Sequence, residues 1–252
     1  MAGIIKDRTT NRLIRGLPDE AFTLIAPYLM RVDLPVGTPL VEANKPIEHV
    51  YFIESGLASM VATSADGNSL EVGHIGYERI SGYPVLLGID RTPNRTFMQV
   101  AGSGLALSAN RFLSLQANPE AHLIFLRYIH TRELQLAHSA LAAARYYMHQ
   151  RVARWLLMCH DRLNVDDMPL THDFLALMLG VRRAGVTLQL HILEGMHAIK
   201  STRGNVRIVN RGILLDVAGS SYGVPEAEYE RLIGSELSQE RPLKLREVGW
   251  SR

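Results

Sequence analysis

Residues 170–199, LTHDFLALMLGVRRAGVTLQLHILEGMHAI, decide the fold of this chain. An apolar segment ends at Gly180, and a second helical segment opens with Arg182 and Arg183. A basic ribbon over residues 200–207, KSTRGNVR, follows at once. Helix, tight turn, helix and hairpin in this order outline a winged helix-turn-helix, which places its second helix in the major groove of DNA. We therefore expect double-stranded DNA as the main partner.

The side chains of this unit divide into an inward set and an outward set. In the second helix Val186, Leu190 and Leu193 recur at spacings of four and three, so they face the core. Thr171 can cap the first helix. Arginine can pair with guanine through two hydrogen bonds, and glutamine can pair with adenine in the same way. The predicted DNA contacts are Thr171, Arg182, Arg183, Thr187, Gln189, Lys200, Arg203 and Arg207.

The charge of this region differs from that of the whole chain. The chain has a net charge of +2, whereas residues 181–211 hold six basic side chains against Glu194 alone. Such a local positive field neutralises phosphates and makes binding sensitive to salt. Two alternatives remain: a solvated basic face without a partner, and a sensor or scaffold protein that has lost specific DNA binding.

Length and composition describe an ordinary globular protein. The chain has 252 residues, 47% of them hydrophobic, which is enough for one large or two modest domains. The single cysteine, Cys159, excludes an internal disulfide and a cysteine-rich zinc or iron–sulfur site, and it suits a reducing compartment. Residues 1–17 lack the apolar core of a signal peptide, and no run approaches the ~20 apolar residues of a membrane span. These features predict a cytoplasmic protein without a membrane partner.

Residues 32–108 have the pattern of a β-domain. Short extended runs alternate with Gly- and Pro-containing breaks, and the first run stops at residues 54–56. Asp66-Gly67 lies between two extended runs and predicts a hairpin, with positive φ at both central residues. A further run covers residues 97–107, and a short helical lead covers 18–30. The pattern predicts a sandwich, roll or barrel of antiparallel strands.

From Pro119 the pattern becomes helical, and one set of apolar residues recurs at spacings of three and four. Two helices that pack along their length need such a seam. A helix packed on its own domain is the alternative. We prefer a homodimer, because DNA readers of this type work as two-fold pairs. The predicted dimer seam is Leu134, Ala137, Leu141, Ala144 and Met148.

The expected fold class is α+β with four parts. These are an antiparallel, jelly-roll-like β-roll over residues 1–118, a long dimerisation helix over 119–149, a winged helix-turn-helix over 150–218, and a polar tail over 219–252 with one helix after Pro225.

The chain resembles the CRP/FNR family of bacterial transcription regulators from about Leu13 to Ala218. The match is strongest in residues 170–199, where Arg183 falls on the family's principal base-contacting arginine. Further matches are Gly37, the turn at 52–56, Asp66-Gly67, residues 151–157 and the wing at 203–205. The resemblance implies a homodimer on an inverted-repeat site, with a cyclic-nucleotide-binding-like roll whose effector alters the geometry of the dimer helices. It also implies RNA polymerase as a partner.

Two departures from the family pattern bear on specificity. Where the family usually carries a glutamate that reads cytosine, this chain has Ala184. In the family, one carboxylate holds the ribose of a cyclic nucleotide, and its position falls on or near Gly82, which has no carboxylate. The resemblance therefore does not identify the effector. The pocket can also be filled by Tyr83, Leu86 and Phe97. The candidate effector-binding residues are Arg95, Thr96, Gly82 and Tyr83.

An enzyme is a rival reading, because small β-rolls also host metal sites in cupin-like proteins. That chemistry needs two or three histidines and a carboxylate on adjacent strands. Residues 32–108 hold only His49 and His74, and neither belongs to a His-x-His pair. The two are candidates for haem ligation by residue type alone, and a structural role is more common. We therefore expect no catalytic residue, no metal site and no iron–sulfur cluster.

Overall fold

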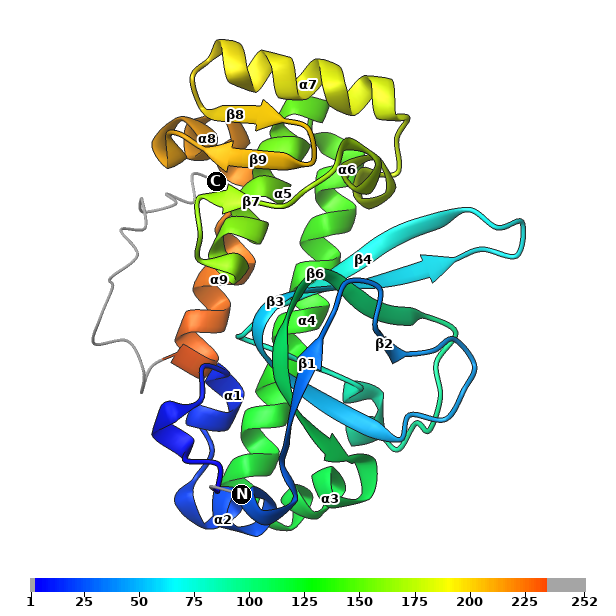
Figure 1. Ribbon diagram of the computed structural model, residues 1–252, viewed down its shortest axis with the longest axis vertical. Coiled ribbons are helices and arrows are strands. Elements are labelled where there is room, and N and C mark those ends of the chain that lie inside the picture. The colour runs from blue at the N-terminus through cyan, green and yellow to red at the C-terminus, as the bar shows by residue number, and fades with distance from the viewer. Residues whose placement is uncertain (1–2, 235–252) are drawn as a thin grey trace, which may run out of the picture.

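The computed structural model describes residues 3–234. A β-roll with the N-terminal helices forms one end of the molecule, a small helical head forms the other, and one long helix runs between them (Figure 1). The expected α+β class, with an antiparallel roll at the N-terminus and a helix-turn-helix at the C-terminus, is confirmed.

The roll is one antiparallel sheet. Its strands are β1 (Met30–Leu34), β2 (Pro39–Val41), β3 (His49–Thr63), β4 (Ser69–Ile75), β5 (Ile80–Ser81) and β6 (Arg95–Ser108). The order is β1-β6-β3-β4, with β2 paired to β6 and β5 paired to β3. The long strands β3 and β6 therefore form the spine of the roll.

Two details of β3 differ from the sequence expectation. The strand does not stop at residues 54–56 but continues through them, and shifts of register there mark bulges against β6. Gly56 has a φ of +82°, and a Cβ at this position would meet the carbonyl oxygen of Val100 at 2.6 Å, so glycine is required. The hairpin at Asp66-Gly67 is present, but only Gly67 has a positive φ because the loop spans Ser64 to Asn68.

Short helices close the roll. They are η1 (Lys6–Arg8), α1 (Arg12–Arg15), α2 (Asp19–Ile25), η2 (Ala26–Tyr28), η3 (Tyr83–Leu87), α3 (Ala109–Leu113) and η4 (Ser114–Ala117). Apolar residues of α1 and α2 pack with Phe52, Phe112 and Phe125 in one cluster. This cluster fixes the N-terminal helices against the start of the long helix.

The long helix α4 (Pro119–Arg145) begins at a strong cap. The Asn118 side chain accepts a hydrogen bond from the N–H of Ala121 at 2.9 Å, and Pro119 occupies the first helical position. Extended backbone at Tyr146 and Tyr147 then separates α4 from α5 (Met148–Leu163). Among residues 3–234 no helix, α4 included, is both long and apolar enough to cross a membrane.

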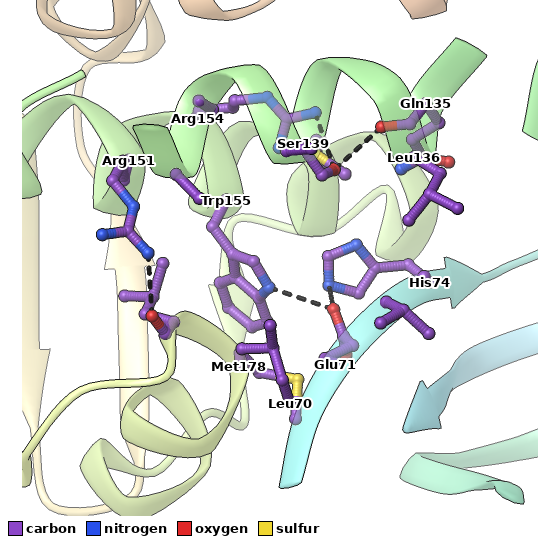
Figure 2. A pocket seen from close by; sticks show the side chains of 17 residues that line it. Leu70, Glu71, His74, Gln135, Leu136, Ser139, Arg151, Arg154, Trp155 and Met178 are labelled. Atoms are coloured by element: carbon purple, nitrogen blue, oxygen red, sulfur yellow. Dashed lines mark hydrogen bonds and ion pairs between the residues drawn. The ribbon is translucent and has the colours of Figure 1, made fainter. Parts of the chain in front are cut away.

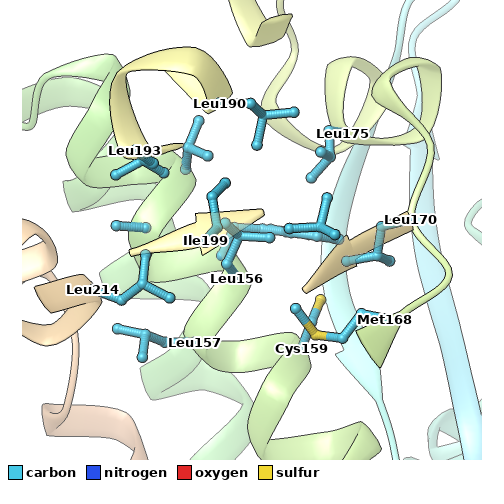
Figure 3. Packing of buried hydrophobic residues seen from close by; sticks show 14 of the residues in the cluster. Leu156, Leu157, Cys159, Met168, Leu170, Leu175, Leu190, Leu193, Ile199 and Leu214 are labelled. Atoms are coloured by element: carbon cyan, nitrogen blue, oxygen red, sulfur yellow. The ribbon is translucent and has the colours of Figure 1, made fainter. Parts of the chain in front are cut away.

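The head contains α6 (His172–Leu179), α7 (Arg183–Gly195), α8 (Arg211–Ala218) and the three-stranded sheet of β7 (Asp167–Met168), β8 (Ile199–Thr202) and β9 (Asn205–Ile208). Leu156, Leu190, Leu193 and Leu214 meet in its core (Figure 3). Every residue from Val152 to Cys159 is buried, because the head covers one side of α5 and the roll covers the other.

Residues 219–234 depart from the expected polar tail. They form η5 (Gly219–Ser221), α9 (Val224–Tyr229) and η6 (Glu230–Gly234), and they return from the head to the roll. Tyr229 and Ile233 are buried in the same cluster as α1. Arg12 Nη2 donates to Glu230 Oε2 at 2.7 Å, which ties the segment to the N-terminus. The rest of the expected tail, residues 235–252, lies outside the described residues.

Candidate nucleic-acid interface

The helix-turn-helix has the local geometry that its sequence predicts. Thr171 Oγ1 accepts a hydrogen bond from the N–H of Phe174 at 3.1 Å and so caps α6. Gly180 ends α6 in the left-handed conformation, with a φ of +63°. Helix α7 then begins at Arg183, with Arg182 as its extended N-cap residue. The turn therefore brings both arginines to the start of the second helix.

Arg182 and Arg183 are both exposed. Arg183 Nη1 donates to Asp173 Oδ2 at 3.0 Å, with the two side chains 65% and 69% exposed. An ion pair this exposed contributes little net energy, because water and salt screen it. The Arg183 guanidinium can therefore exchange Asp173 for another anionic partner at small cost.

Two other predicted contacts on α7 face partly inward. The Thr187 hydroxyl lies 2.9 Å from His172 Nδ1 and 3.2 Å from the Arg183 carbonyl oxygen, so neighbouring groups of the head already engage it. His172 also lies 3.2 Å from the Ser201 hydroxyl, which links α7 to the wing. Gln189 is half-buried. Both residues therefore flank the outward face of α7 instead of forming its centre.

The outward centre of α7 includes two residues that the sequence reasoning missed, Leu188 and His191. Ala184, Leu188 and His191 are exposed, on the side opposite to the buried Val186 and Leu190. The sequence contains the signal for these residues. The spacing of the buried Val186 and Leu190 shows which face of α7 is inward, and so which residues lie on the opposite face.

The wing is the β8–β9 hairpin, whose turn contains Gly204 with a φ of +78°. Lys200, Arg203 and Arg207 are exposed along it. Arg207 Nε lies 3.7 Å from Asp167 Oδ2, in an ion pair that is as open to solvent as that of Arg183. The three basic side chains extend the positive surface that begins at the start of α7.

The positive field is weaker than the count over residues 181–211 suggests. Arg211 is half-buried, and its Nη2 donates to Asp161 Oδ1 at 2.6 Å and to the Tyr222 hydroxyl at 3.0 Å. Burial opposes its charge, but Asp161 and Tyr222 outweigh burial and raise the pKa of Arg211. Asp167 and Asp173, which precede the counted stretch, also fold onto the basic surface.

The four candidate effector residues lie on two elements: Arg95 and Thr96 begin β6, and Gly82 and Tyr83 lie at the start of η3. Arg95 is exposed and stacks over Phe97, whereas the neighbouring Thr96 is buried. Gly82, with a φ of +74°, precedes Tyr83 at the start of η3. The Tyr83 ring lies 3.9 Å from the guanidinium of Arg132 on α4. The Tyr83 ring therefore already covers this guanidinium.

Arg132 is a second residue that the sequence reasoning missed. It is 9% exposed, and its Nη2 lies 3.5 Å from the Met60 sulfur inside the roll. Tyr128, Thr131 and Gln135 share its buried face of α4. The sequence signal for Arg132 was its position, because this charged residue has the helical spacing of the buried positions of α4.

A cavity of about 180 Å³ lies where the roll, the long helix and the head meet (Figure 2). At its wall, Trp155 Nε1 donates to Glu71 Oε1 at 3.3 Å, and the Glu71 carboxylate lies against the ring of the buried His74. Burial lowers the pKa of His74, against the opposing effect of Glu71. The Trp155 ring meets both His74 of the roll and Phe174 of the head edge-on.

Further contacts join the roll directly to the helix-turn-helix. A Cβ at Gly180 would lie 2.9 Å from Leu70 of β4, so the turn between α6 and α7 rests on this strand. The Ser59 hydroxyl of β3 lies 3.9 Å from the Met178 sulfur of α6. Strands β3 and β4 therefore both contact the helix-turn-helix.

A buried charge cluster makes a second connection. Glu78 Oε1 lies 3.0 Å from Arg79 Nε and 2.8 Å from Arg162 Nε, and all three residues are less than 10% exposed. Burial and the nearby Arg162 lower the pKa of Arg79. Burial also opposes the charge of Arg162, but Glu78 and other acidic groups outweigh it and raise the pKa of Arg162. Glu78 thus joins the roll to α5.

The predicted dimer seam lies mostly on the open side of α4. Ala137, Leu141 and Ala144 are exposed and Leu134 is half-buried, whereas α4 packs on its own chain through another face, where Tyr128 and Gln135 are buried. Met148 is the exception: it belongs to α5 and packs against the head core, because the helix breaks at Tyr146 and Tyr147. The open seam continues instead toward the start of α4, where Leu123 is 46% exposed.

The two histidines that a cupin-like site requires are not brought together with other ligands. His74 is occupied by Glu71 and Trp155, and the His49 ring lies 6.3 Å from that of Tyr51. Within residues 3–234, His, Cys, Asp and Glu side chains form no group of three or more that could hold a metal ion. The described part of the chain thus offers no donor set for such a site.

Comparisons with known proteins agree with the helix-turn-helix and with the overall fold described above. Residues 150–217 match the family described as the Crp-like helix-turn-helix domain. The fold resembles FixK2 from Bradyrhizobium japonicum, with a TM-score of 0.66 and 16% identity over 76% of this chain and 98% of that one. It resembles the c-di-GMP-responsive global regulator CLP from Xanthomonas campestris, with a TM-score of 0.62 and 18% identity over 76% and 99% of the two chains.

A third solved structure is similar as well. The CRP-family transcriptional regulator TTHB099 from Thermus thermophilus has a TM-score of 0.61 and 18% identity, over 75% of this chain and 96% of that one. Among curated proteins, none matches this chain. The resemblance drawn from the sequence is confirmed: residues 150–217 form a Crp-like helix-turn-helix domain, and the chain has the fold of the CRP/FNR transcription regulators.

Proposed function

We propose that this chain is a sequence-specific DNA-binding transcription regulator that acts as a homodimer on an inverted-repeat site. One observation carries the proposal. The helix-turn-helix exposes Arg182 and Arg183 at the start of α7, and the wing exposes three further basic side chains beside it. Both elements match the parts of a winged helix that contact the groove and the phosphates of DNA.

The roll would serve as a sensor. Its strand β4 rests on the turn before α7, and Trp155 bridges the roll and the head across the cavity between them. An effector that moves the roll would therefore change the position of α7. RNA polymerase would be a further partner of a regulator of this kind.

The proposal is tested by selecting bound DNA from a random pool of duplexes, with and without cell extract. We expect enrichment of an inverted repeat whose half-sites lie roughly 34–36 Å apart, the spacing of one helical turn. Footprinting of the enriched duplex should show two protected regions related by a two-fold axis. A pool that stays random under both conditions would contradict DNA binding and would favour a sensor or scaffold.

The wing gives a prediction about salt. Arg203 is exposed in the wing turn and has no ion-pair partner among residues 3–234, so it is free to contact a phosphate. Replacing Arg203 with glutamine should reduce the slope of log affinity against log salt by about one unit for each bound subunit. The matched control is Arg8→Gln in η1, since the N-terminal helices lie at the end of the molecule opposite to the head (Figure 1). An unchanged slope in Arg203→Gln would remove this residue from the interface.

The open seam of α4 gives a prediction about assembly. Leu141 is 46% exposed at its centre, and a glutamate there would place charges opposite one another across a two-fold axis. Leu141→Glu should convert the dimer to a monomer in sedimentation velocity experiments. Val36→Glu changes a residue that is 65% exposed in the turn between β1 and β2, and it should leave the dimer intact. A dimer that persists in Leu141→Glu would refute the seam.

A further inference from the structure

The outward face of α7 combines exposed apolar side chains with a basic border. Leu188 is 58% exposed, Ile192 is 43% exposed, and Ala184 lies one turn before Leu188 on the same face. The helix lies at the edge of the head, away from the roll (Figure 1). Val186 and Leu190 of the same helix belong to the hydrophobic cluster of the head, whereas Leu188 and Ile192 lie outside this cluster.

The surroundings of this apolar strip indicate what it meets. Arg182 and Arg183 precede it on the same helix, and Lys200, Arg203 and Arg207 lie on the wing. A polyanion with apolar groups between its charged edges would complement such a surface. The major groove of DNA has this character, because phosphates line its edges and the C5-methyl group of thymine projects from its floor.

Gly185 is an independent sign of a close approach. It lies within α7, where glycine is less favourable than alanine. A Cβ at this position would meet nothing within 4 Å, so the packing of the chain does not call for glycine. Glycine in such a place leaves room for the backbone to approach another molecule. It lies one turn before Leu188, on the side of the helix where the strip is exposed.

We infer that Leu188, with Ala184 beside it, recognises the methyl group of a thymine close to the guanine that Arg183 pairs with. The inference rests on the proposed DNA binding and narrows it to a class of target. Each half-site then contains a thymine whose contribution depends on its methyl group. Leu188 is a specificity-determining residue in this reading, and Arg183 supplies the neighbouring hydrogen-bonded contact.

The test replaces thymine with uracil, one position at a time, in the duplex enriched from the random pool. Uracil keeps the hydrogen-bonding groups of thymine and lacks only the methyl group. At one position in each half-site, the substitution should weaken binding about fourfold per half-site, the change expected for one buried methyl group. The other thymines of the site should tolerate uracil.

Two variants assign the effect to a side chain. In Leu188→Ala, the affinities for the thymine and uracil duplexes should become nearly equal. Leu215→Ala removes a similarly exposed leucine from α8 in the same head, and it should retain the difference. Because both residues lie at the surface, unfolding midpoints close to that of the unchanged protein should accompany both results.

Each remaining outcome has a distinct meaning. If the protein binds its selected site but no uracil substitution matters, the inference is wrong and the proposed function stands. If uracil weakens binding equally in the unchanged protein and in Leu188→Ala, Leu188 does not read the methyl group. If no duplex is enriched with or without extract, both the proposed function and this inference fail.

Discussion

Replacing Arg183 with alanine is expected to remove about 1–3 kcal/mol of binding free energy at each half-site of the selected DNA, the range for one bidentate arginine–guanine pair. The residue is exposed at the first helical position of α7, and the equally exposed Asp173 is the one ion-pair partner of its guanidinium among residues 3–234. Binding to random DNA should change much less. Lys200, Arg203 and Arg207 remain to neutralise phosphates, and phosphate contacts do not depend on sequence.

The measurement compares the affinity for the selected duplex with that for a random duplex of equal length at one salt concentration. Asp173 complicates the single variant, because loss of Arg183 leaves its carboxylate facing the DNA. The double variant Arg183→Ala with Asp173→Asn removes this added repulsion. The control, Arg8→Ala, removes the same charge in η1, among the N-terminal helices that lie far from the head (Figure 1). An equal loss on both duplexes would contradict a base-reading role for Arg183.

Replacing Glu78 with glutamine should lower the free energy of unfolding by about 3–5 kcal/mol, the usual cost of breaking a buried ion pair. Two guanidinium groups, of Arg79 and Arg162, lie within 3.0 Å of one Glu78 oxygen, and all three residues are nearly inaccessible to water. Glutamine keeps the shape of the side chain but removes its charge. The arginines would then repel one another in a medium of low polarity.

Urea unfolding at neutral pH measures this effect. Glu20→Gln is the control, since Glu20 is exposed on α2, and its free energy of unfolding should change by less than about 0.5 kcal/mol. Adding Arg162→Met to Glu78→Gln should restore part of the loss, because an apolar side chain needs no counter-charge. A loss below about 1 kcal/mol in Glu78→Gln would contradict a stabilising role for the cluster.

Local patterns predicted the head well. The Thr171 cap, the left-handed Gly180 and the spacing of Val186, Leu190 and Leu193 all act within one or two helical turns, and each has its predicted place. The strand pattern of the roll was also readable. The prediction for the roll was wrong at residues 54–56. These residues resemble a turn in the sequence, but they form part of a bulged strand because they lie against β6.

The candidate site was predicted in part. The five basic side chains are exposed as expected: Arg182, Arg183, Lys200, Arg203 and Arg207. Thr187 and Gln189 instead flank the outward face of α7. In the predicted dimer seam, Met148 packs against the head core. Leu188 and Ile192 were not predicted, because only polar and charged side chains were expected to contact DNA, although the spacing of Val186 and Leu190 already indicates the outward face. The buried position of Arg132 was not predicted, because its partners Tyr83 and Met60 come from segments of the roll that are distant in the sequence.

The sequence alone determined the order of elements and the identity of the reading head, since caps, turns and apolar periodicity are properties of neighbouring residues. Only the tertiary structure decided which charges meet. Asp173 reaches Arg183, Glu78 joins Arg162, and residues 224–234 return to cover α4 and α1. These contacts depend on how α5 packs between roll and head, and such packing brings together residues that no local pattern connects.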